Sequence, residues 1–268
     1  MPPEMAALLA DLAAESEVIT QMLAGLAPED YEMATPAKGW AIRDQVSHLA
    51  YFDQMEVVAA TEPERFRSEA AELMEVGDSF PDEVARRYSN TPARELPGWF
   101  GTARTQLIET FASIDARTRL PWFGPEMSAA SAITARLMET WAHGQDIADT
   151  IGLVREPTDR LRHIAHLGVS TFAFAHRLRG LEAPRDAVRV ELASPGGVAW
   201  SWGPEGASDL VAGSALDFCL VVTQRRNVAD TTLEVRGRAA RLWMGIAQAY
   251  AGAPGPGREA GSFPEKER

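Results

Sequence analysis

Apolar residues recur at helical spacing along roughly the first two thirds of the chain. Between residues 4 and 25, the residues Leu8, Leu12 and Leu23 fall on one face when they are placed on an α-helix. Two prolines, Pro92 and Pro97, interrupt a later helical stretch, where they predict a break or a kink. The same spacing predicts further helices over residues 40–60, 61–75, 83–115, 128–151 and 157–179.

The pattern changes after residue 180. Residues 189–192 and 198–202 alternate like short strands, and the Ser-Pro-Gly-Gly segment between them favours a hairpin turn. A helix over 214–223, a strand over 232–235 and a helix over 239–250 are expected to follow. The fold class is therefore predicted as α+β, with a helical domain over residues 1–180 and a small α+β domain over 181–252. A tail over 253–268, rich in Gly, Pro and charged residues, is expected to lack fixed structure.

Composition narrows the classes of protein that fit. The 268 residues are 46% hydrophobic and 24% charged, as in soluble globular proteins. The net charge is −12 and no run of Lys or Arg is present, which argues against nucleic acid or an anionic membrane as a partner. We expect a cytoplasmic protein, because the chain shows no signal-peptide pattern and no apolar stretch long enough to span a bilayer. The single cysteine, Cys219, lies in an apolar run and is expected to be a buried thiol.

The predicted helix over 128–151 contains residues that could bind a metal ion. Glu139 and His143 are four residues apart and therefore project from one helical face, which Asp146 shares. A carboxylate and an imidazole on one face are half of a metal site, although a solvated Glu and a packing His would show the same spacing. His48, in the predicted helix over 40–60, could complete the set if the two helices pack at that level. Two imidazoles and one carboxylate are the ligands of an open catalytic zinc site.

Two segments carry a resemblance to a known family. The segments Gly39–Leu49 (GWAIRDQVSHL) and Arg136–Asp146 (RLMETWAHGQD) resemble the signature segments of the DinB-like superfamily, in its actinobacterial branch related to mycothiol-dependent maleylpyruvate isomerase. The segment Ser214–Arg226 is similar to part of the small α+β domain that follows the bundle in many members. The resemblance implies an amino-terminal four-helix bundle that holds a divalent metal, usually zinc. It implies His48, Glu139 and His143 as the ligands.

The resemblance also implies supporting residues. Members commonly have a Gly-Arg pair after the apolar helix of the small domain, where this chain has Gln224-Arg225-Arg226. Arg225 is in register with that arginine, which implies contact with the anionic part of a substrate. Independently of the resemblance, Asp44 and Asp146 lie one turn from predicted ligands. Each is a hydrogen-bond support for the metal site, a further ligand, or a structural residue.

The expected activity follows from a coordination position of the metal that no protein ligand fills. A cation there lowers the pKa of a bound thiol and so provides a nucleophile at neutral pH. The resemblance implies mycothiol as the thiol cosubstrate and a small electrophilic, acidic substrate, which would undergo isomerisation or thiol S-transfer. Two alternatives stay open at this point: a metal-dependent hydrolase, and a non-catalytic small-molecule binding protein with a structural metal.

Overall fold

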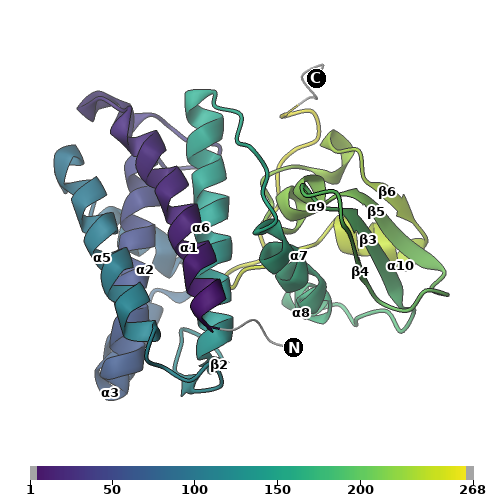
Figure 1. Cartoon of the computed structure of the whole chain (residues 1–268), viewed down its shortest axis with the longest axis horizontal. Coiled ribbons are helices and arrows are strands. Elements are labelled where there is room, and N and C mark those ends of the chain that lie inside the picture. Colours follow the sequence, from purple (N-terminus) through teal and green to yellow (C-terminus); the bar gives the residue numbers. More distant parts are fainter. Residues whose placement is uncertain (1–4, 264–268) are drawn as a thin grey trace. The chain divides into compact units, whose positions relative to one another are not determined.

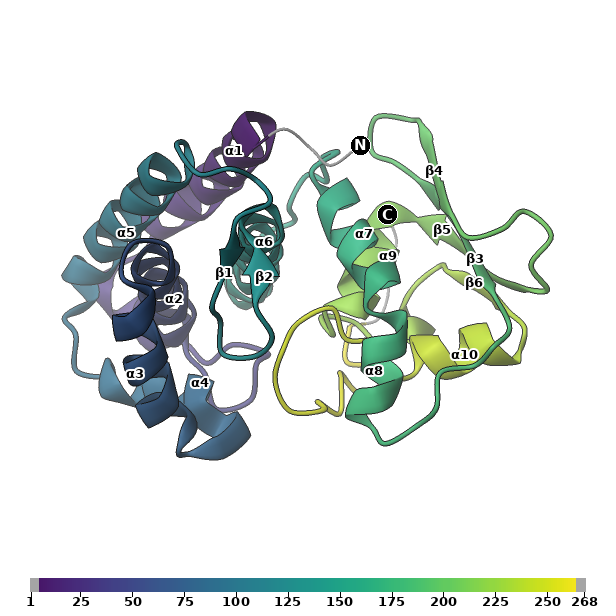
Figure 2. The same cartoon turned by 90° about the horizontal axis from the view of Figure 1, so that it is seen from below.

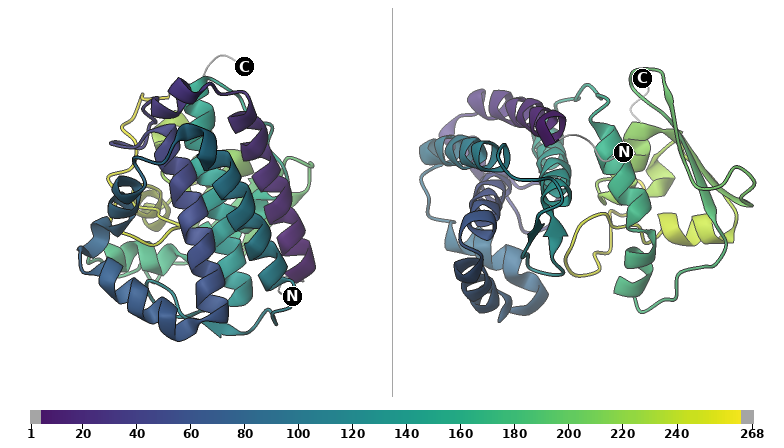
Figure 3. Two further views of the ribbon diagram at one scale, coloured as in Figure 1. Left: turned by 90° about the vertical axis from the view of Figure 1, so that its left-hand side faces the viewer. Right: turned by 60° about the horizontal axis from the view of Figure 1, so that its bottom comes forward.

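The computed structural model describes residues 5–263. The chain forms two compact units, and the boundary between them in the sequence lies between Arg155 and Glu156. In the first unit four long helices lie side by side as a bundle (Figure 1; Figure 3, left). The α+β class and the helical bundle predicted from the sequence are confirmed. The bundle helices are α1 (Met5–Ala24), α2 (Ile42–Thr61), α5 (Leu96–Phe111) and α6 (Ala129–Ile151).

The core of the bundle is made by the apolar faces of these helices. Its buried members come from all four, among them Ile19, Leu49, Phe100 and Ile147. Ser128 directly precedes α6 and caps it by accepting a hydrogen bond from the backbone N–H of Ser131. Among residues 5–263, no helix combines the length and the apolar character needed to cross a bilayer.

The segments between α2 and α5 and between α5 and α6 together form a separate aromatic cluster. Phe66 stacks on Trp122 with ring centroids 5.7 Å apart, and Phe80 stacks on Phe123 at 5.1 Å. Phe52 carries this cluster toward α2, since its ring contacts that of Phe123 edge-on. The two segments therefore add a second apolar core beside the bundle. Its elements are α3 (Pro63–Met74), α4 (Phe80–Arg87) and the antiparallel hairpin of β1 (Arg119–Leu120) and β2 (Met127–Ser128).

The second unit is built on a four-stranded sheet of order β4-β3-β5-β6 (Figure 2). Strand β3 (Val188–Ala193) pairs antiparallel with β4 (Ala199–Trp202), as the Ser-Pro-Gly-Gly turn predicted. It also pairs parallel with β5 (Asp209–Ser214), which in turn pairs antiparallel with β6 (Glu234–Arg236). The helices of this unit are α7 (Leu161–Ser170), α8 (Phe172–Leu178), α9 (Ala215–Val222) and α10 (Arg238–Met244).

The boundary between the units differs from the one predicted at residue 180. Helix α7 belongs to the second unit because it packs on α9. A Cβ atom at Gly168 would lie 2.8 Å from a methyl carbon of Val222, so the glycine permits this close approach. The Sγ atom of Cys219 also donates a hydrogen bond to the carbonyl of Leu161 at 3.4 Å. The helical spacing of apolar residues predicts a helix at α7. It does not predict which domain the apolar face of that helix packs against.

Three further predictions are corrected. Strand β5 was not predicted, because only a few apolar residues alternate in it before Gly213, and the last helix ends at Met244 instead of residue 250. The tail over 253–268 was expected to lack fixed structure, but its residues up to 263 are held by hydrogen bonds. The carbonyl of Gly255 accepts from Arg179 at 2.6 Å, and the carbonyl of Arg258 accepts from Asn227 at 2.9 Å. Residues 264–268 of the predicted tail lie outside the described residues.

Candidate metal site

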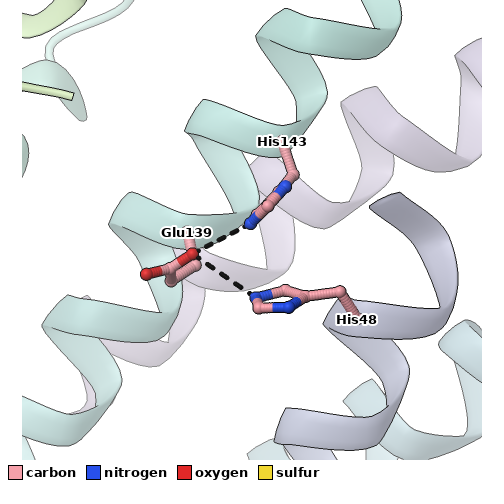
Figure 4. A group of neighbouring side chains, drawn as sticks. All are labelled: His48, Glu139 and His143. Atoms are coloured by element: carbon pink, nitrogen blue, oxygen red, sulfur yellow. Dashed lines mark hydrogen bonds and ion pairs between the residues drawn. The ribbon is translucent and has the colours of Figure 1, made fainter. Parts of the chain in front are cut away.

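The three residues predicted as metal ligands lie together in the first unit (Figure 4). His48 projects from α2, and Glu139 and His143 project from α6. The Oε2 atom of Glu139 is 3.0 Å from Nε2 of His143 and 3.6 Å from Nε2 of His48. One ligand atom from each residue lies within 4.8 Å of the other two. Two imidazole nitrogens and a carboxylate oxygen thus converge on one point.

A buried ionic network sets the register that brings His48 to α6. Arg136, one turn before Glu139, donates from Nε to Asp53 at 2.9 Å and from Nη2 to the carbonyl of Leu49 at 3.2 Å. Arg104 on α5 donates to the other oxygen of the same carboxylate at 2.7 Å. Asp53 is fully buried and both arginines are nearly so. Because an unpaired buried charge is costly, these bonds favour one antiparallel register of α2 and α6 over its neighbours.

The electrostatics of the three side chains suit a divalent cation. Burial, together with the neighbouring His143 ring, lowers the pKa of His48 to about 3, so this imidazole is neutral. Burial by itself raises the pKa of Glu139, but hydrogen bonds and charge interactions with His143 and His48 outweigh it and hold the pKa well below its usual value. A neutral imidazole and an ionised carboxylate are the forms that bind metal. The Glu139 side chain is 23% exposed, which leaves one side of the site open to solvent.

The support for His143 comes from a residue that the sequence did not single out. The Nδ1 atom of His143 is hydrogen-bonded to the amide oxygen of Gln45, in the first turn of α2. Asp44, predicted as a support, instead accepts the backbone N–H of Ala41 at 2.8 Å and so caps α2. Asp146 is fully buried on α6 but does not take the Nδ1 position. Spacing along one helix favoured these aspartates, whereas the residue that contacts the ring lies 98 positions away in sequence.

Trp40 covers one face of the site. Its ring lies 5.8 Å from that of His143, nearly parallel to it, and 5.4 Å from that of His48. The ring of His48 also contacts that of Phe52, with the centroids 4.6 Å apart. Trp40 also lines an open groove of about 380 Å³ whose walls include Asp82 and Arg86. The rings of Trp40 and Phe52 therefore border the site, and Trp40 connects it to a groove with charged residues in its walls.

Comparison with known proteins identifies the family to which the bundle belongs. The sequence pattern of the mycothiol maleylpyruvate isomerase N-terminal domain matches residues 12–148, about half of the chain, including all three converging residues. The chain belongs to this family. Two uncharacterized proteins of Mycobacterium tuberculosis, from strains CDC 1551 / Oshkosh and H37Rv, are each 44% identical to it over 255 residues. The match covers 93% of this chain and 97% of each relative.

Solved structures of the family share the fold. The crystal structure of the mycothiol-dependent maleylpyruvate isomerase superposes with a TM-score of 0.57 at 14% sequence identity. A variant of that isomerase with one histidine replaced by alanine superposes with a TM-score of 0.58 at 15% identity. Each comparison covers 83% of this chain and 90% of the other. The family fold thus extends over both units of the chain.

The remaining predicted residues of this family member lie in the second unit. Arg225 follows α9, where its side chain donates to the carbonyl of Thr223 at 2.6 Å, and its role toward a substrate stays a prediction. Cys219 is fully buried, and burial raises the pKa of its thiol well above the usual value. This confirms the buried thiol predicted from the sequence. Such a cysteine is not a nucleophile at neutral pH.

Proposed function

We propose that this protein is a metal-dependent enzyme that uses a low-molecular-weight thiol, mycothiol, either to isomerise a small electrophilic substrate or to transfer the thiol sulfur to it. The observation that carries the proposal is the convergence of His48, Glu139 and His143, with one side of the site open. These donors are the set found in catalytic zinc sites, where three protein ligands leave a position for substrate. Membership of the family supports mycothiol as the thiol and isomerisation as the type of reaction.

Each side chain of the site has a definable part in such a reaction. A divalent cation held there lowers the pKa of a thiol, so that a nucleophile is present at neutral pH. His48 and His143 offer Nε2 lone pairs, and Glu139 offers a negative charge that offsets part of the charge of the cation. Trp40 covers the rings on one face and limits access of water there.

The thiol has to come from a second molecule. Cys219 is the single cysteine of the chain, and its raised pKa and full burial exclude it as the nucleophile. The groove beside Trp40, with the carboxylate of Asp82 and the guanidinium of Arg86 in its walls, gives a polar cosubstrate a place to bind near the metal. The thiolate sulfur would add to one carbon of a double bond conjugated to a carbonyl group, and the π electrons would move to the carbonyl oxygen as an enolate. Rotation about the resulting single bond and loss of the thiolate would re-form the double bond in the isomer. Protonation of the enolate by solvent would instead give a product that retains the sulfur, which is S-transfer.

An acidic substrate is the class we propose for the electrophile. Arg225 is the residue in register with the family arginine, and its guanidinium can pair with a carboxylate. Replacing Arg225 with Lys is expected to raise the substrate KM more than it lowers kcat, because a lysine keeps the charge but loses the two-pronged geometry. An unchanged KM would remove Arg225 from the proposal.

Metal and thiol measurements test the proposal directly. We expect about one zinc per chain by elemental analysis, and loss of that zinc in His48→Ala and in His143→Ala. The exposed His166 gives a matched control, because His166→Ala removes an imidazole outside the site. Ultraviolet titration of added mycothiol should show thiolate near neutral pH with the zinc protein and not with His48→Ala. Stoichiometric zinc without thiolate formation would favour a hydrolase, and absence of bound zinc would contradict the proposed function as a whole.

A further inference from the structure

Gln45 is a fully buried polar residue that touches one of the converging imidazoles. It lies in the first turn of α2, and its amide oxygen is hydrogen-bonded to Nδ1 of His143. At the opposite edge of the same ring, Nε2 of His143 faces the carboxylate of Glu139 at 3.0 Å. If a metal ion occupied the site, Nε2 of His143 and the carboxylate of Glu139 would each bind it, and the hydrogen bond between them would be lost. The contact with Gln45 is then the hydrogen bond that continues to hold the ring.

Thr35 decides which way the Gln45 amide points. The hydroxyl of Thr35 has one proton, and it donates that proton to the carbonyl of Trp40 at 2.9 Å. Toward Gln45 it can therefore offer only a lone pair, which accepts from the amide nitrogen Nε2 of Gln45 at 2.8 Å. With the nitrogen directed at Thr35, the amide oxygen of Gln45 is directed at His143. An amide oxygen is only an acceptor, so Nδ1 of His143 must carry the proton.

The turn that holds Thr35 is itself well defined. The backbone N–H of Thr35 donates to the carbonyl of Trp40 at 2.8 Å, and Ala34 forms an isolated β-bridge with Ala41. Gly39 has a φ of 85°, a left-handed conformation that closes the turn at little steric cost. The same short segment thus supplies Thr35, which orients Gln45, and Trp40, whose ring stacks on His143.

We propose that Gln45 is a positioning residue that keeps the proton of His143 on Nδ1 and thereby presents the Nε2 lone pair to a metal. This inference rests on the metal site of the proposed function, but not on its thiol chemistry. A metal-bound imidazole commonly donates its other N–H to an acceptor, which fixes the ring and its tautomer. His143 has such an acceptor. His48 does not, since its Nδ1 atom is buried without a hydrogen-bond partner among the described residues.

The contrast between the two rings predicts how the site responds to substitution. His48 is oriented by contacts of its ring with Trp40 and Phe52, so changes at Gln45 should act on the metal through His143. Gln45→Leu removes the acceptor and fills a similar volume. We expect it to weaken zinc binding by about 10- to 100-fold. Gln45→Glu keeps an acceptor at this position and should bind zinc within a few-fold of the wild type.

Thr35 offers a second, milder test. Thr35→Val is close in shape but removes the hydroxyl, so the Gln45 amide loses the contact that orients it. Zinc binding should weaken by a few-fold, and Thr35→Ser, which keeps the hydroxyl, should restore it. Thr134→Val provides a control with the same substitution, because Thr134 is a half-buried residue of α6 whose hydroxyl donates to the carbonyl of Ala130 in its own helix. It should leave zinc affinity unchanged even if it lowers stability.

The experiment is a zinc titration of these full-length variants against a chromophoric chelator, with nitrogen-15 NMR of the histidine rings. In the zinc-loaded wild type and in Gln45→Glu, the Nδ1 proton of His143 should exchange slowly with water. In Gln45→Leu it should exchange rapidly. Wild-type zinc affinity in a folded Gln45→Leu would overturn the role of Gln45 and leave the proposed metal site intact. If Gln45→Leu does not fold, equal zinc affinity in Thr35→Val and Thr35→Ser would overturn it, and failure of the wild type to bind zinc would overturn both proposals.

Discussion

The indole of Trp40 stacks on the imidazole of His143, with the ring centroids 5.8 Å apart and an angle of 13° between the ring planes. The stack is anchored at its outer edge, where Nε1 of Trp40 donates to the carboxylate of Asp82 at 2.7 Å. An exposed residue of α4 thereby holds an aromatic ring over the candidate metal site. The position of Trp40 makes it a natural optical reporter of what binds there.

Cobalt binding should therefore quench the fluorescence of Trp40. Co²⁺ takes the same imidazole and carboxylate ligands as zinc, and a nearby open-shell ion quenches an excited indole. We expect part of the tryptophan emission to be lost on titration with Co²⁺. Most of that change should be absent in Trp40→Phe, which keeps an aromatic ring over the site. Trp243, buried in the second unit, provides the control, because Trp243→Phe should leave the quenching unchanged.

Loss of the Asp53 carboxylate should destabilise the bundle strongly. Asp53→Ala leaves Arg104 and Arg136 buried without their shared counter-charge, which costs about 3–5 kcal/mol in comparable cases. The measurement is the free energy of unfolding of the metal-free protein in urea. Arg65→Ala removes the solvent-exposed pair of Arg65 with Glu69 and should change the stability little. Equal effects of the two substitutions would show that the buried network does not set the register of α2 and α6.

Glu56 should make the stability of the bundle depend on pH. Its side chain is buried, neither oxygen has a hydrogen-bond partner among residues 5–263, and burial raises its pKa from 4.5 to about 8. The folded state thus binds the proton more tightly than the unfolded state does. The contribution of this tighter proton binding to the free energy of unfolding is fully present below about pH 4.5 and is lost as the pH rises to about 8.

Substitution of Glu56 by an uncharged residue of similar shape isolates this effect. Glu56→Gln should be more stable than the wild type by about 1–3 kcal/mol at pH 8.5, and the gain should shrink toward pH 5. Urea unfolding across this pH range measures the difference. Glu72→Gln, at an exposed position of α3, should show no such trend. A constant difference between wild type and Glu56→Gln at all pH values would mean that Glu56 is ionised in the folded protein.

Removal of the carboxy-terminal segment after Gly252 should loosen the second unit. The truncation removes the Gly255 carbonyl that accepts from Arg179 and the Arg258 carbonyl that accepts from Asn227. Hydrogen exchange of amides in residues 223–228 should accelerate, and the thermal midpoint of this unit should fall. Pro254→Ala, at an exposed position of the same segment, should leave both unchanged. Unchanged exchange in the truncated chain would show that the segment does not contribute to the unit.

Local features of the chain were predictable because their causes are local. The 3.6-residue period of α1, α2 and α6 and the Ser-Pro-Gly-Gly turn between β3 and β4 depend on residues close together in sequence. The spacing of Glu139 and His143 belongs to this group, since four positions on one helix always bring two side chains to the same face. The resemblance to a known family added His48, which spacing alone left undecided.

Other features depend on which elements meet, and a periodic pattern does not contain that information. The placement of α7 with the second unit follows from its packing on α9, and β5 is a strand because β3 and β6 pair with it on either side. The order of the tail up to residue 263 depends in the same way on side chains of distant segments, such as Arg179 and Asn227.

The candidate site likewise has features that the sequence predicts and features that depend on tertiary contacts. The sequence by itself determined that α6 carries a carboxylate and an imidazole on one face. The tertiary structure decided that His48 faces them and that Gln45 contacts Nδ1 of His143. The register of two antiparallel helices makes this choice, and buried contacts such as those of Asp53 with Arg136 and Arg104 set it. Contacts of this kind join residues about 50 to 100 positions apart, so their energy appears only when the chain is folded.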